Sequence, residues 1–222
     1  MFKQLLSVFL ESRCQFCERP TSNNVCQSLC EYCHQKLSSL QLSKSDRQKL
    51  DQTQSVYAWG CYDGQLKRAI ALMKYQNQPE IGRLLGSELG KTWIDSGMLK
   101  RSPKATVVPI PMHQEKQQQR GFNQAEIIAR EFCQVTGYSL NTRTLVRIKA
   151  TEAMFNFKST LARAKNLQGA FEVGSKLPQH PVLLVDDIYT TGTTVKEAVK
   201  VLQAHRIKVI GVAVVAKAGL DI

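Results

Sequence analysis

The sequence lacks any apolar run long enough to cross a membrane, although 43% of its 222 residues are hydrophobic. Its longest apolar runs, 182–185 and 209–216, fall far short of the roughly 20 residues that a transmembrane helix needs. The start of the chain has one early lysine and a short apolar stretch, but Glu11, Ser12 and Arg13 make a poor cleavage site for a secretory signal. We therefore expect no membrane span and no secretory signal. The length allows one main domain with a small appended module.

Acidic residues are scarce relative to basic ones. The chain holds 30 Lys and Arg against 18 Asp and Glu, which gives a formal net charge of +12. Most of the excess lies in residues 56–222, which contain 23 basic and 13 acidic residues. Such a balance favours phosphate-bearing partners, either a small anionic ligand or a nucleic-acid backbone, although a merely soluble basic surface has the same composition.

Cysteine is nearly absent after residue 33, yet five of the seven cysteines lie in residues 14–33. Four of them form two CxxC pairs separated by 12 residues: Cys14, Cys17, Cys30 and Cys33. Each such pair can sit on a tight turn and supply two thiolates to a tetrahedral zinc ion. Four cysteine ligands leave no open coordination position, so we expect the zinc to be structural.

Two alternatives stay open for this cysteine group. Cys26 lies four residues before Cys30 and is a competing ligand, and His34 is a weaker substitute. Disulfide pairing is the second alternative, but the odd number of cysteines and the missing export signal disfavour it.

The polar stretch that follows the cysteines predicts a helix end and a connector, so we place a domain boundary near Ser55. The predicted domains are a four-cysteine zinc-binding module with its linker, residues 1–55, and a larger domain, residues 56–222. In the larger domain, strand-like and helix-like segments alternate. The expected strands are 56–62, 106–110, 182–185 and 209–215, and the expected helices are 65–74, 80–94, 124–135 and 195–205. Continuous apolar strands that alternate with helices predict a parallel α/β sheet with helices on both faces.

The segment 182–194, VLLVDDIYTTGTT, combines a buried strand, two carboxylates and a threonine-rich turn before a helix. Such a turn lies at the carboxyl edge of the sheet, where open α/β sheets bind ligands. Gly192 allows a close backbone approach, and the N–H groups at the start of the helix suit phosphate oxygens. Four threonines add hydroxyl donors: Thr190, Thr191, Thr193 and Thr194. Asp186 and Asp187 suit the 2- and 3-hydroxyls of a ribose, and they attract a magnesium ion that bridges a diphosphate.

This segment is neither a Walker loop nor a GxGxxG dinucleotide turn. A simpler interpretation is that Asp187 or one threonine caps the helix. One cap needs one residue, however, whereas two carboxylates and four threonines surround one glycine here. We therefore predict a site for a ribose 5-phosphate group of the kind carried by phosphoribosyl diphosphate.

The same segment resembles the phosphoribosyl-diphosphate motif of type I phosphoribosyltransferases, and four further motifs narrow the resemblance. They are LMKY at 72–75, VPIPMH at 108–113, RGFNQA at 120–125 and NLQGAF at 166–171. Together with the four-cysteine module, these motifs resemble the ComF family, which includes ComFC and GntX-like proteins, over nearly the whole chain. The resemblance implies a type I phosphoribosyltransferase-like parallel sheet.

The resemblance also implies a function. Members of this family are expected to be cytoplasmic and to take part in the natural transformation of competent bacteria. They are expected to act on internalised single-stranded DNA, beside a DNA-uptake helicase or recombination proteins. By the same resemblance, the two carboxylates and the threonine-rich turn contact the ribose phosphate. The loop on the diphosphate side is formed by Pro111, Met112 and His113.

Residues 114–123 read as a polar loop between a strand and a helix, and we predict that they form a mobile lid over the pocket. The candidates for lid or DNA contacts are Arg120, Gly121, Phe122, Asn123 and Gln124. Lys74 and Tyr75 either close the pocket or merely end a helix. Single-stranded DNA is expected to stack on one or more of Tyr57, Trp59, Tyr62, Tyr75 and Phe122.

Different classes of function fit these features. In the first, the protein is a DNA-uptake accessory protein that holds phosphoribosyl diphosphate, or another ribose 5-phosphate ligand, and binds single-stranded DNA. In the second, it is a working phosphoribosyltransferase that joins a nitrogenous acceptor to the ribose, and magnesium with Lys and Arg stabilises the departing diphosphate. In the third, residues 1–55 are a zinc-bearing protein-interaction partner. We do not expect a glutamine-dependent amidotransferase, because it needs a cysteine after Met1, where the sequence has Phe2.

Overall fold

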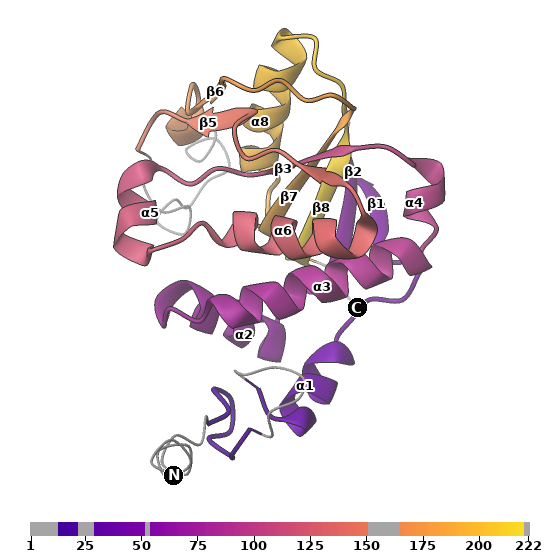
Figure 1. The fold of residues 1–222 in the computed structure, drawn as a ribbon, viewed down its shortest axis with the longest axis vertical. Coiled ribbons are helices and arrows are strands. Elements are labelled where there is room, and N and C mark those ends of the chain that lie inside the picture. Colours follow the sequence, from indigo (N-terminus) through magenta and orange to yellow (C-terminus); the bar gives the residue numbers. More distant parts are fainter. Residues whose placement is uncertain (1–12, 22–28, 52–53, 151–164, 220–222) are drawn as a thin grey trace, which may run out of the picture.

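The computed structural model of the chain describes residues 13–21, 29–51, 54–150 and 165–219 (Figure 1). Its strands are β1 (Gln48–Asp51), β2 (Gln54–Cys61), β3 (Thr106–Pro109), β4 (Ser139–Leu140), β5 (Leu145–Arg147), β6 (Phe171–Val173), β7 (Val182–Tyr189) and β8 (Val209–Lys217). Its helices are α1 (Glu31–Ser38), α2 (Gly64–Tyr75), α3 (Pro79–Asp95), α4 (Met98–Arg101), α5 (Gln114–Arg120), α6 (Gln124–Thr136) and α8 (Thr193–Ala204). Within these residues, no helix has the length and apolar character of a membrane span.

Six strands form the main sheet, in the order β1-β2-β8-β7-β3-β4. Neighbouring strands are parallel except for β1 and β2, which are antiparallel. β5 and β6 form a separate two-stranded antiparallel sheet. The central strands β7 and β8 are buried along most of their length, which explains their unbroken apolar runs. The predicted parallel α/β sheet is confirmed.

Helices cover both faces of this sheet. In Figure 1, α2, α3 and α6 lie on one side and α8 lies on the other, next to β5 and β6. The first side buries Ile70, Leu85 and Phe132 in one apolar cluster, whereas α8 buries Val199 and Leu202 in a second cluster. Both clusters share the sheet, so the strands that end at its carboxyl edge are fixed from two sides.

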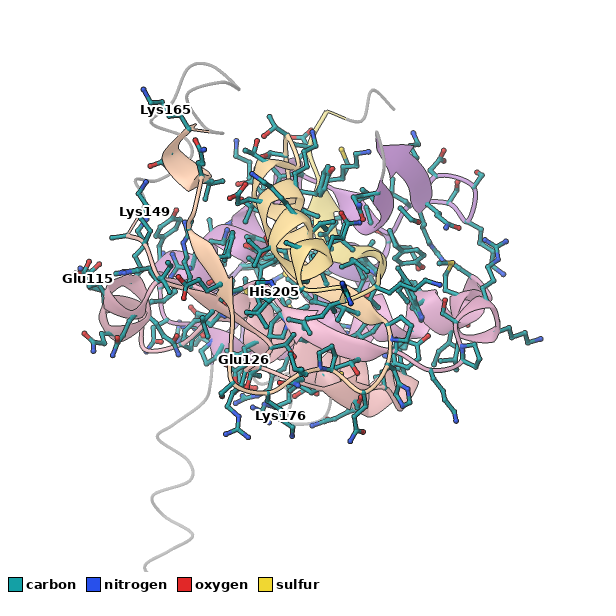
Figure 2. All side chains as sticks on the ribbon, turned by 90° about the horizontal axis from the view of Figure 1, so that it is seen from above. Glu115, Glu126, Lys149, Lys165, Lys176 and His205 are labelled. Carbon is teal, nitrogen blue, oxygen red and sulfur yellow. The ribbon has the colours of Figure 1, made fainter. Side chains whose placement is uncertain are left out.

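Charged side chains lie on the outside of the sheet and its covering helices. In the view onto α8, the labelled side chains of Lys149, Lys165 and Lys176 lie toward the outside of the molecule (Figure 2), and all three are exposed. Glu115 on α5 lies on the same side as Lys149 in this view, and it is exposed as well (Figure 2). The basic excess of the larger domain therefore includes lysines that are open to solvent.

Two glycines let α3 and α6 approach each other closely. A Cβ atom at Gly86 would lie 2.5 Å from the carbonyl oxygen of Ile128, and one at Gly90 would lie 2.8 Å from Cβ of Val135. Real Cβ atoms do not tolerate such distances, so larger residues at either position would push the helices apart. This contact holds α6, and with it the residues that begin α6, against the sheet.

The structure corrects three expectations from the sequence. β7 continues four residues beyond the predicted strand end, to Tyr189, because β8 pairs with it along that whole length. Residues 114–120 form helix α5, although a loop was predicted. Its Gln, Glu, Lys and Arg residues favour a helix, but none is buried, so no apolar periodicity marked it. The predicted connector contains strand β1.

The predicted domain boundary near Ser55 stays a prediction. The edge strand β1 precedes that position and pairs with β2 of the main sheet. Arg47, just before β1, is buried and donates hydrogen bonds to the carbonyl of Leu42 at 2.8 Å and to Oγ of Ser96 at 3.1 Å. Residues on both sides of Ser55 therefore pack together in the structure.

Candidate functional site

An opening forms at the carboxyl edge of the sheet, where β7 extends beyond the end of its neighbour β3. The pairing of β3 with β7 ends at Pro109 and Val185, because the chain turns away through Ile110 and Pro111. On the other side, β8 stays paired with β7 as far as Tyr189. The last four residues of β7 are thus supported from one side only. Parallel sheets bind ligands at such openings of their carboxyl edge.

A cavity of about 410 Å³ lies at this opening. This volume falls in the range of about 300–1,000 Å³ that is typical of small-molecule sites. Its walls carry two carboxylates and four cations, which are Asp186, Asp187, Lys74, Lys116, Arg120 and Arg147. The excess of positive charge suits an anionic ligand.

Asp187 is buried and forms an ion pair with Lys74, from the last turn of α2. Burial raises the pKa of the Asp187 carboxyl, but the Lys74 ammonium outweighs burial and holds that pKa below its ordinary value. Likewise, burial lowers the pKa of Lys74, but Asp187 more than compensates and raises it. Both groups are therefore charged at neutral pH, and Lys74 fixes the position of the carboxylate. Lys74 also lines the cavity, and its contact with a ligand stays a prediction.

Asp186 differs electrostatically from its neighbour. Burial, and then the negative charge of Asp187, raises the pKa of Asp186 well above its ordinary value. Its Oδ1 accepts a hydrogen bond from the backbone N–H of Asp187 at 2.8 Å. The Asp186 carboxyl group therefore readily binds a proton or a cation, because either one reduces its repulsion from Asp187.

The turn after β7 presents backbone N–H groups at the start of α8. Gly192 occupies the position before the helix with φ of +70°, and no side chain caps the helix there. A Cβ atom at Gly192 would lie 2.1 Å from Oη of Tyr189, so only glycine fits. The hydroxyls of Thr191 and Thr193 lie 2.7 Å apart and bond to each other. The simpler interpretation of this turn, a side-chain cap by Asp187 or a threonine, is therefore wrong.

The structure brings ten of the sequence-predicted ligand and lid residues to the cavity wall: Lys74, Pro111, Met112, Arg120, Asn123, Gln124, Asp186, Asp187, Thr190 and Thr194. Six others are adjacent in sequence but are not among its lining residues: His113, Gly121, Phe122, Thr191, Gly192 and Thr193. Ligand contact stays a prediction for the residues of both groups.

Some of the predicted residues have a structural task. Asn123 accepts a hydrogen bond from the N–H of Ala125 and donates one to the carbonyl of Ile110, both at 3.1 Å, so it caps α6 and ties it to the end of β3. His113 precedes α5, with its Nδ1 3.7 Å from a carboxylate oxygen of Glu115. Two of the aromatic residues predicted to stack on DNA, Tyr57 and Trp59, are 1% and 0% exposed. That prediction is wrong for these two, because both lie in the core.

Two cations of the cavity were missed from the sequence. Lys116 lies four residues before Arg120, and a predicted helix over 114–120 would have placed both on one face. Arg147 comes from β5 and packs over the ring of Phe171, with its guanidinium carbon 5.5 Å from the ring centre. No local pattern links β5 to the end of β7, since only the fold brings them together.

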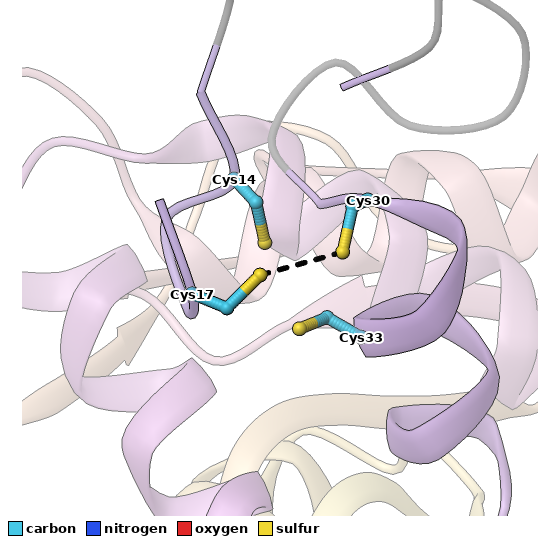
Figure 3. A group of neighbouring side chains, drawn as sticks. All are labelled: Cys14, Cys17, Cys30 and Cys33. Atoms are coloured by element: carbon cyan, nitrogen blue, oxygen red, sulfur yellow. Dashed lines mark hydrogen bonds between the residues drawn. The ribbon is translucent and has the colours of Figure 1, made fainter. Parts of the chain in front are cut away.

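The four cysteines form a second candidate site, at the start of α1 and in the segment before it. Their Sγ atoms all lie within 4.8 Å of one another, and those of Cys17 and Cys30 are 3.5 Å apart (Figure 3). Tetrahedral zinc with Zn–S bonds of about 2.3 Å requires sulfur atoms just under 4 Å apart, which this cluster fits. His34 is not part of the group, and Cys26 lies outside the described residues. The cluster can hold a metal ion.

Backbone N–H groups favour the thiolate of Cys14, whereas burial raises the pKa of Cys33. Burial opposes ionisation of Cys14, but hydrogen bonds from the backbone of Cys30, Phe16 and Cys17 lower its pKa to about 7. The N–H of Phe16 donates to Sγ of Cys14 at 3.4 Å. Such an arrangement pre-forms a metal ligand, because metals bind the thiolate.

Helix α2 connects the cysteine cluster with the cavity. Near its start, Arg68 donates to the carbonyl of Phe16 at 3.2 Å and packs over the Phe16 ring. At its end, Lys74 reaches Asp187. Helix α2 therefore contacts both sites.

Comparisons with known proteins agree with this architecture. Residues 118–220, which include Arg120 and the whole β7–α8 segment, match the family model described as "Phosphoribosyl transferase domain". The fold and this match define the class: the chain has a phosphoribosyltransferase domain with a four-cysteine cluster at its N-terminal end.

Named relatives narrow the class to a family. The chain is 27% identical over 198 residues to "Competence protein ComFC" of Bacillus subtilis, which covers 85% of this chain and 70% of that protein. It is 30% identical over 149 residues to "Competence protein F" of Haemophilus influenzae, covering 65% and 64% respectively. It is 29% identical over 96 residues to "DNA utilization protein YhgH" of Salmonella typhi, but that match spans only 43% of this chain and 42% of the relative. The matched family model and the two competence relatives make the chain similar to the ComF family of phosphoribosyltransferase-domain proteins.

Proposed function

We propose that the protein is a DNA-uptake accessory protein that holds phosphoribosyl diphosphate, or another ribose 5-phosphate ligand, and binds single-stranded DNA during natural transformation. The names of the competence and DNA-utilization relatives support the setting. The ComF resemblance supports a cytoplasmic location, with a DNA-uptake helicase or recombination proteins as partners. The observation that carries the ligand assignment is the uncapped start of α8 beside Asp186 and Asp187 at one cavity.

Each wall of the cavity has a separate task in this proposal. The N–H groups and hydroxyls of residues 190–194 hold the 5-phosphate, since a helix start attracts anions. Asp186 and Asp187 accept hydrogen bonds from the ribose hydroxyls, and Lys74 keeps Asp187 charged and in place. Pro111, Met112 and His113 form the diphosphate-side loop, and Lys116, Arg120 and Arg147 add positive charge.

Two metals fit the donor groups. Magnesium prefers oxygen ligands, and Asp186 offers a carboxylate whose raised pKa a nearby cation would lower. When bound, magnesium would neutralise the charge of the diphosphate. Zinc fits the four thiolates of the cysteine cluster and would hold residues 14–33 together.

Calorimetric titration of phosphoribosyl diphosphate with magnesium tests the ligand assignment. We expect saturable binding to the wild type, and its loss in the Asp186→Asn, Asp187→Asn double variant. Asp187→Asn leaves Lys74 without its carboxylate, so thermal unfolding must show that the variant is folded, and Asp186→Asn alone provides a milder change. Asp95→Asn, an exposed carboxylate at the end of α3, is the control. If the double variant is folded and binds the ligand as tightly as the wild type does, the pocket assignment is wrong.

A second candidate function is phosphoribosyl transfer to a nitrogenous acceptor. In that reaction, the bond between ribose C1 and the diphosphate oxygen breaks, a bond from C1 to the acceptor nitrogen forms, and diphosphate leaves. The four cations in the cavity wall favour this candidate, because fixed positive charge stabilises a departing diphosphate. Diphosphate release, assayed over a panel of nitrogenous bases, tests it. Binding without release from any acceptor would favour the accessory role.

A further inference from the structure

An exposed aromatic ring stands at the mouth of the cavity. Tyr75 is the last residue of α2 and lines the cavity, yet 71% of its surface is exposed. Within the described part of the chain, no other large apolar or aromatic residue reaches that exposure. Its neighbour Lys74 points inward to Asp187, so the end of α2 is held in place and the Tyr75 ring is presented at a fixed position.

A cation lies against this ring. The guanidinium carbon of Arg120 is 5.8 Å from the centre of the Tyr75 ring. Nη1 of Arg120 donates to Oε1 of Gln124 at 2.6 Å, which anchors the side chain to the first turn of α6. Lys116, one turn earlier on α5, lines the same cavity. Burial, together with the charges of Arg147 and Arg120, lowers the pKa of Lys116, as expected where cations gather without enough negative charge.

Other aromatic residues are less suited to stack on a ligand. Tyr57 packs edge-on against Trp93, with ring centres 5.0 Å apart, and Trp59 is fully buried. Phe122 packs against the apolar cluster on the α2 side of the sheet. Tyr62 lines the cavity but is only partly exposed. Tyr75 is thus the ring best placed to receive a planar group from solvent.

We propose that Tyr75 and Arg120 form a platform on which a base of single-stranded DNA stacks, with the strand crossing the mouth of the cavity. Exposed aromatic rings flanked by cations suit single strands, because every unpaired base has a stacking face and every nucleotide brings a phosphate. Paired bases in a duplex are already stacked and do not need this ring. The strand stays at the mouth because the exposed face of Tyr75 lies there, and the interior is left to the phosphosugar. This inference rests on the DNA-binding part of the proposed function.

The test is the affinity for a fluorescein-labelled (dT)20 oligonucleotide, measured by anisotropy. Tyr75→Ala should weaken binding roughly tenfold to a hundredfold, since stacking on one aromatic side chain contributes that much. Tyr75→Phe and Tyr75→Trp should bind within about twofold of the wild type, because they keep a stacking face. Arg120→Ala should weaken binding and reduce the slope of log affinity against log salt by about 0.7, the value expected for one lost phosphate contact on a single strand.

Tyr32 provides a matched control. It is 56% exposed on α1 and also lies near cations, with Arg19 at 5.6 Å and Lys36 at 5.7 Å from its ring centre. Tyr32→Ala should leave the affinity unchanged. An oligonucleotide with 2-aminopurine in place of one base adds a direct reading, because stacking on Tyr75 quenches its fluorescence and Tyr75→Ala should restore it.

The outcomes separate the two proposals. If the wild type binds the oligonucleotide but Tyr75→Ala binds equally well, or if Tyr32→Ala alone loses affinity, the platform is wrong and DNA binding stands. If the wild type does not bind the oligonucleotide at any salt concentration, the DNA-binding part of the proposed function fails, and the platform fails with it. Phosphoribosyl diphosphate binding, measured separately, is untouched by either result.

Discussion

The cysteine cluster and the cavity at the end of β7 are built in opposite ways. The cysteines come from 20 consecutive residues, and two short CxxC turns are enough to bring their sulfur atoms together. The cavity takes its charged groups from α2, α5, β5 and β7, which only the folded sheet brings together. A site made from local turns can be inferred from spacing alone, whereas a distributed site can be inferred only where one of its segments carries a motif.

The two sites nevertheless share one helix. α2 contacts Phe16 through Arg68 and pairs with Asp187 through Lys74. If a substitution at one site leaves the other site unchanged, α2 does not couple the two sites. Changes that spread from the cysteines to the cavity would mean that the module helps to position Lys74.

The largest expected effect comes from removing a cysteine. Cys33→Ser should reduce the zinc content of purified protein from about one ion per chain to near zero, because three thiolates no longer close the tetrahedron. Zinc binding contributes on the order of 10 kcal/mol to the folding of zinc-finger peptides, so the module should lose its structure. Elemental analysis measures the zinc, and proteolysis at residues 14–38 measures the unfolding.

Cys133→Ser is the control for this change, since Cys133 lies on α6 outside the cluster and should leave the zinc content unaltered. Zinc retained at the wild-type level by Cys33→Ser would contradict the assigned ligand set. Phosphoribosyl diphosphate affinity measured on the same variant shows whether the effect spreads through α2.

The next effect concerns the ion pair at the other end of α2. Lys74→Met should destabilise the protein by about 3–5 kcal/mol, because it leaves the buried Asp187 charge without a partner. Urea unfolding measures the loss. Adding Asp187→Asn to Lys74→Met should recover much of it, since the unpaired charge is then gone. Equal stability of Lys74→Met and the wild type would show that Asp187 does not depend on this pair.

A smaller effect, of the opposite sign, is expected at Asp186. Its folded-state pKa is raised above the unfolded value of about 3.9, so the folded state keeps a proton that the unfolded state loses as pH rises through this interval. Stability therefore falls over that interval. Asp186→Asn, which cannot ionise, should be more stable than the wild type at neutral pH, and the difference should vanish below about pH 4.

Ligand binding should change in the opposite direction in this variant. Asp186→Asn is expected to bind phosphoribosyl diphosphate and magnesium more weakly, because it loses a charged oxygen ligand. A variant that is less stable at neutral pH, or whose stability gain is the same at every pH, would contradict the raised pKa.

The smallest effect is expected from the cap of α6. Asn123→Ala should cost about 1 kcal/mol, since it removes the acceptor for the N–H of Ala125 and the donor to Ile110. Asn123→Asp keeps the acceptor and loses only the donor, so it should fall between Asn123→Ala and the wild type. Thermal unfolding of the three proteins measures the series. If Asn123→Asp loses as much stability as Asn123→Ala does, the hydrogen bond to the carbonyl of Ile110 accounts for the effect, and the cap of α6 does not.

Much of the fold could be predicted, because its elements have strong apolar periodicity. The strands β3, β7 and β8 and the helices α2, α3, α6 and α8 lie close to where the sequence placed them. The predicted apolar face of α6, with Ile128 and Phe132, is buried as expected. α5 and β1 were missed for the opposite reason: α5 buries no residue, and β1 is a short polar edge strand.

The candidate site could be predicted only in part. Asp186, Asp187 and Gly192 lie in one segment whose composition is unusual enough to stand out. Arg147 could not be found, because its neighbours on β5 carry no motif and its approach to the cavity depends on the separate β5–β6 sheet. The burial of Tyr57 and Trp59 could not be predicted, because alternation along β2 does not tell which aromatic rings point into a core covered on both faces.

The most direct test of the central proposal follows the backbone amide signals of residues 190–194 by NMR during titration with ribose 5-phosphate. If this turn holds the phosphate, the N–H resonances of Gly192, Thr193 and Thr194 should shift downfield and saturate together, while those of the cysteine module stay in place. If ribose 5-phosphate binds and these three resonances do not move, the phosphate lies elsewhere and the assignment of the β7–α8 turn is wrong.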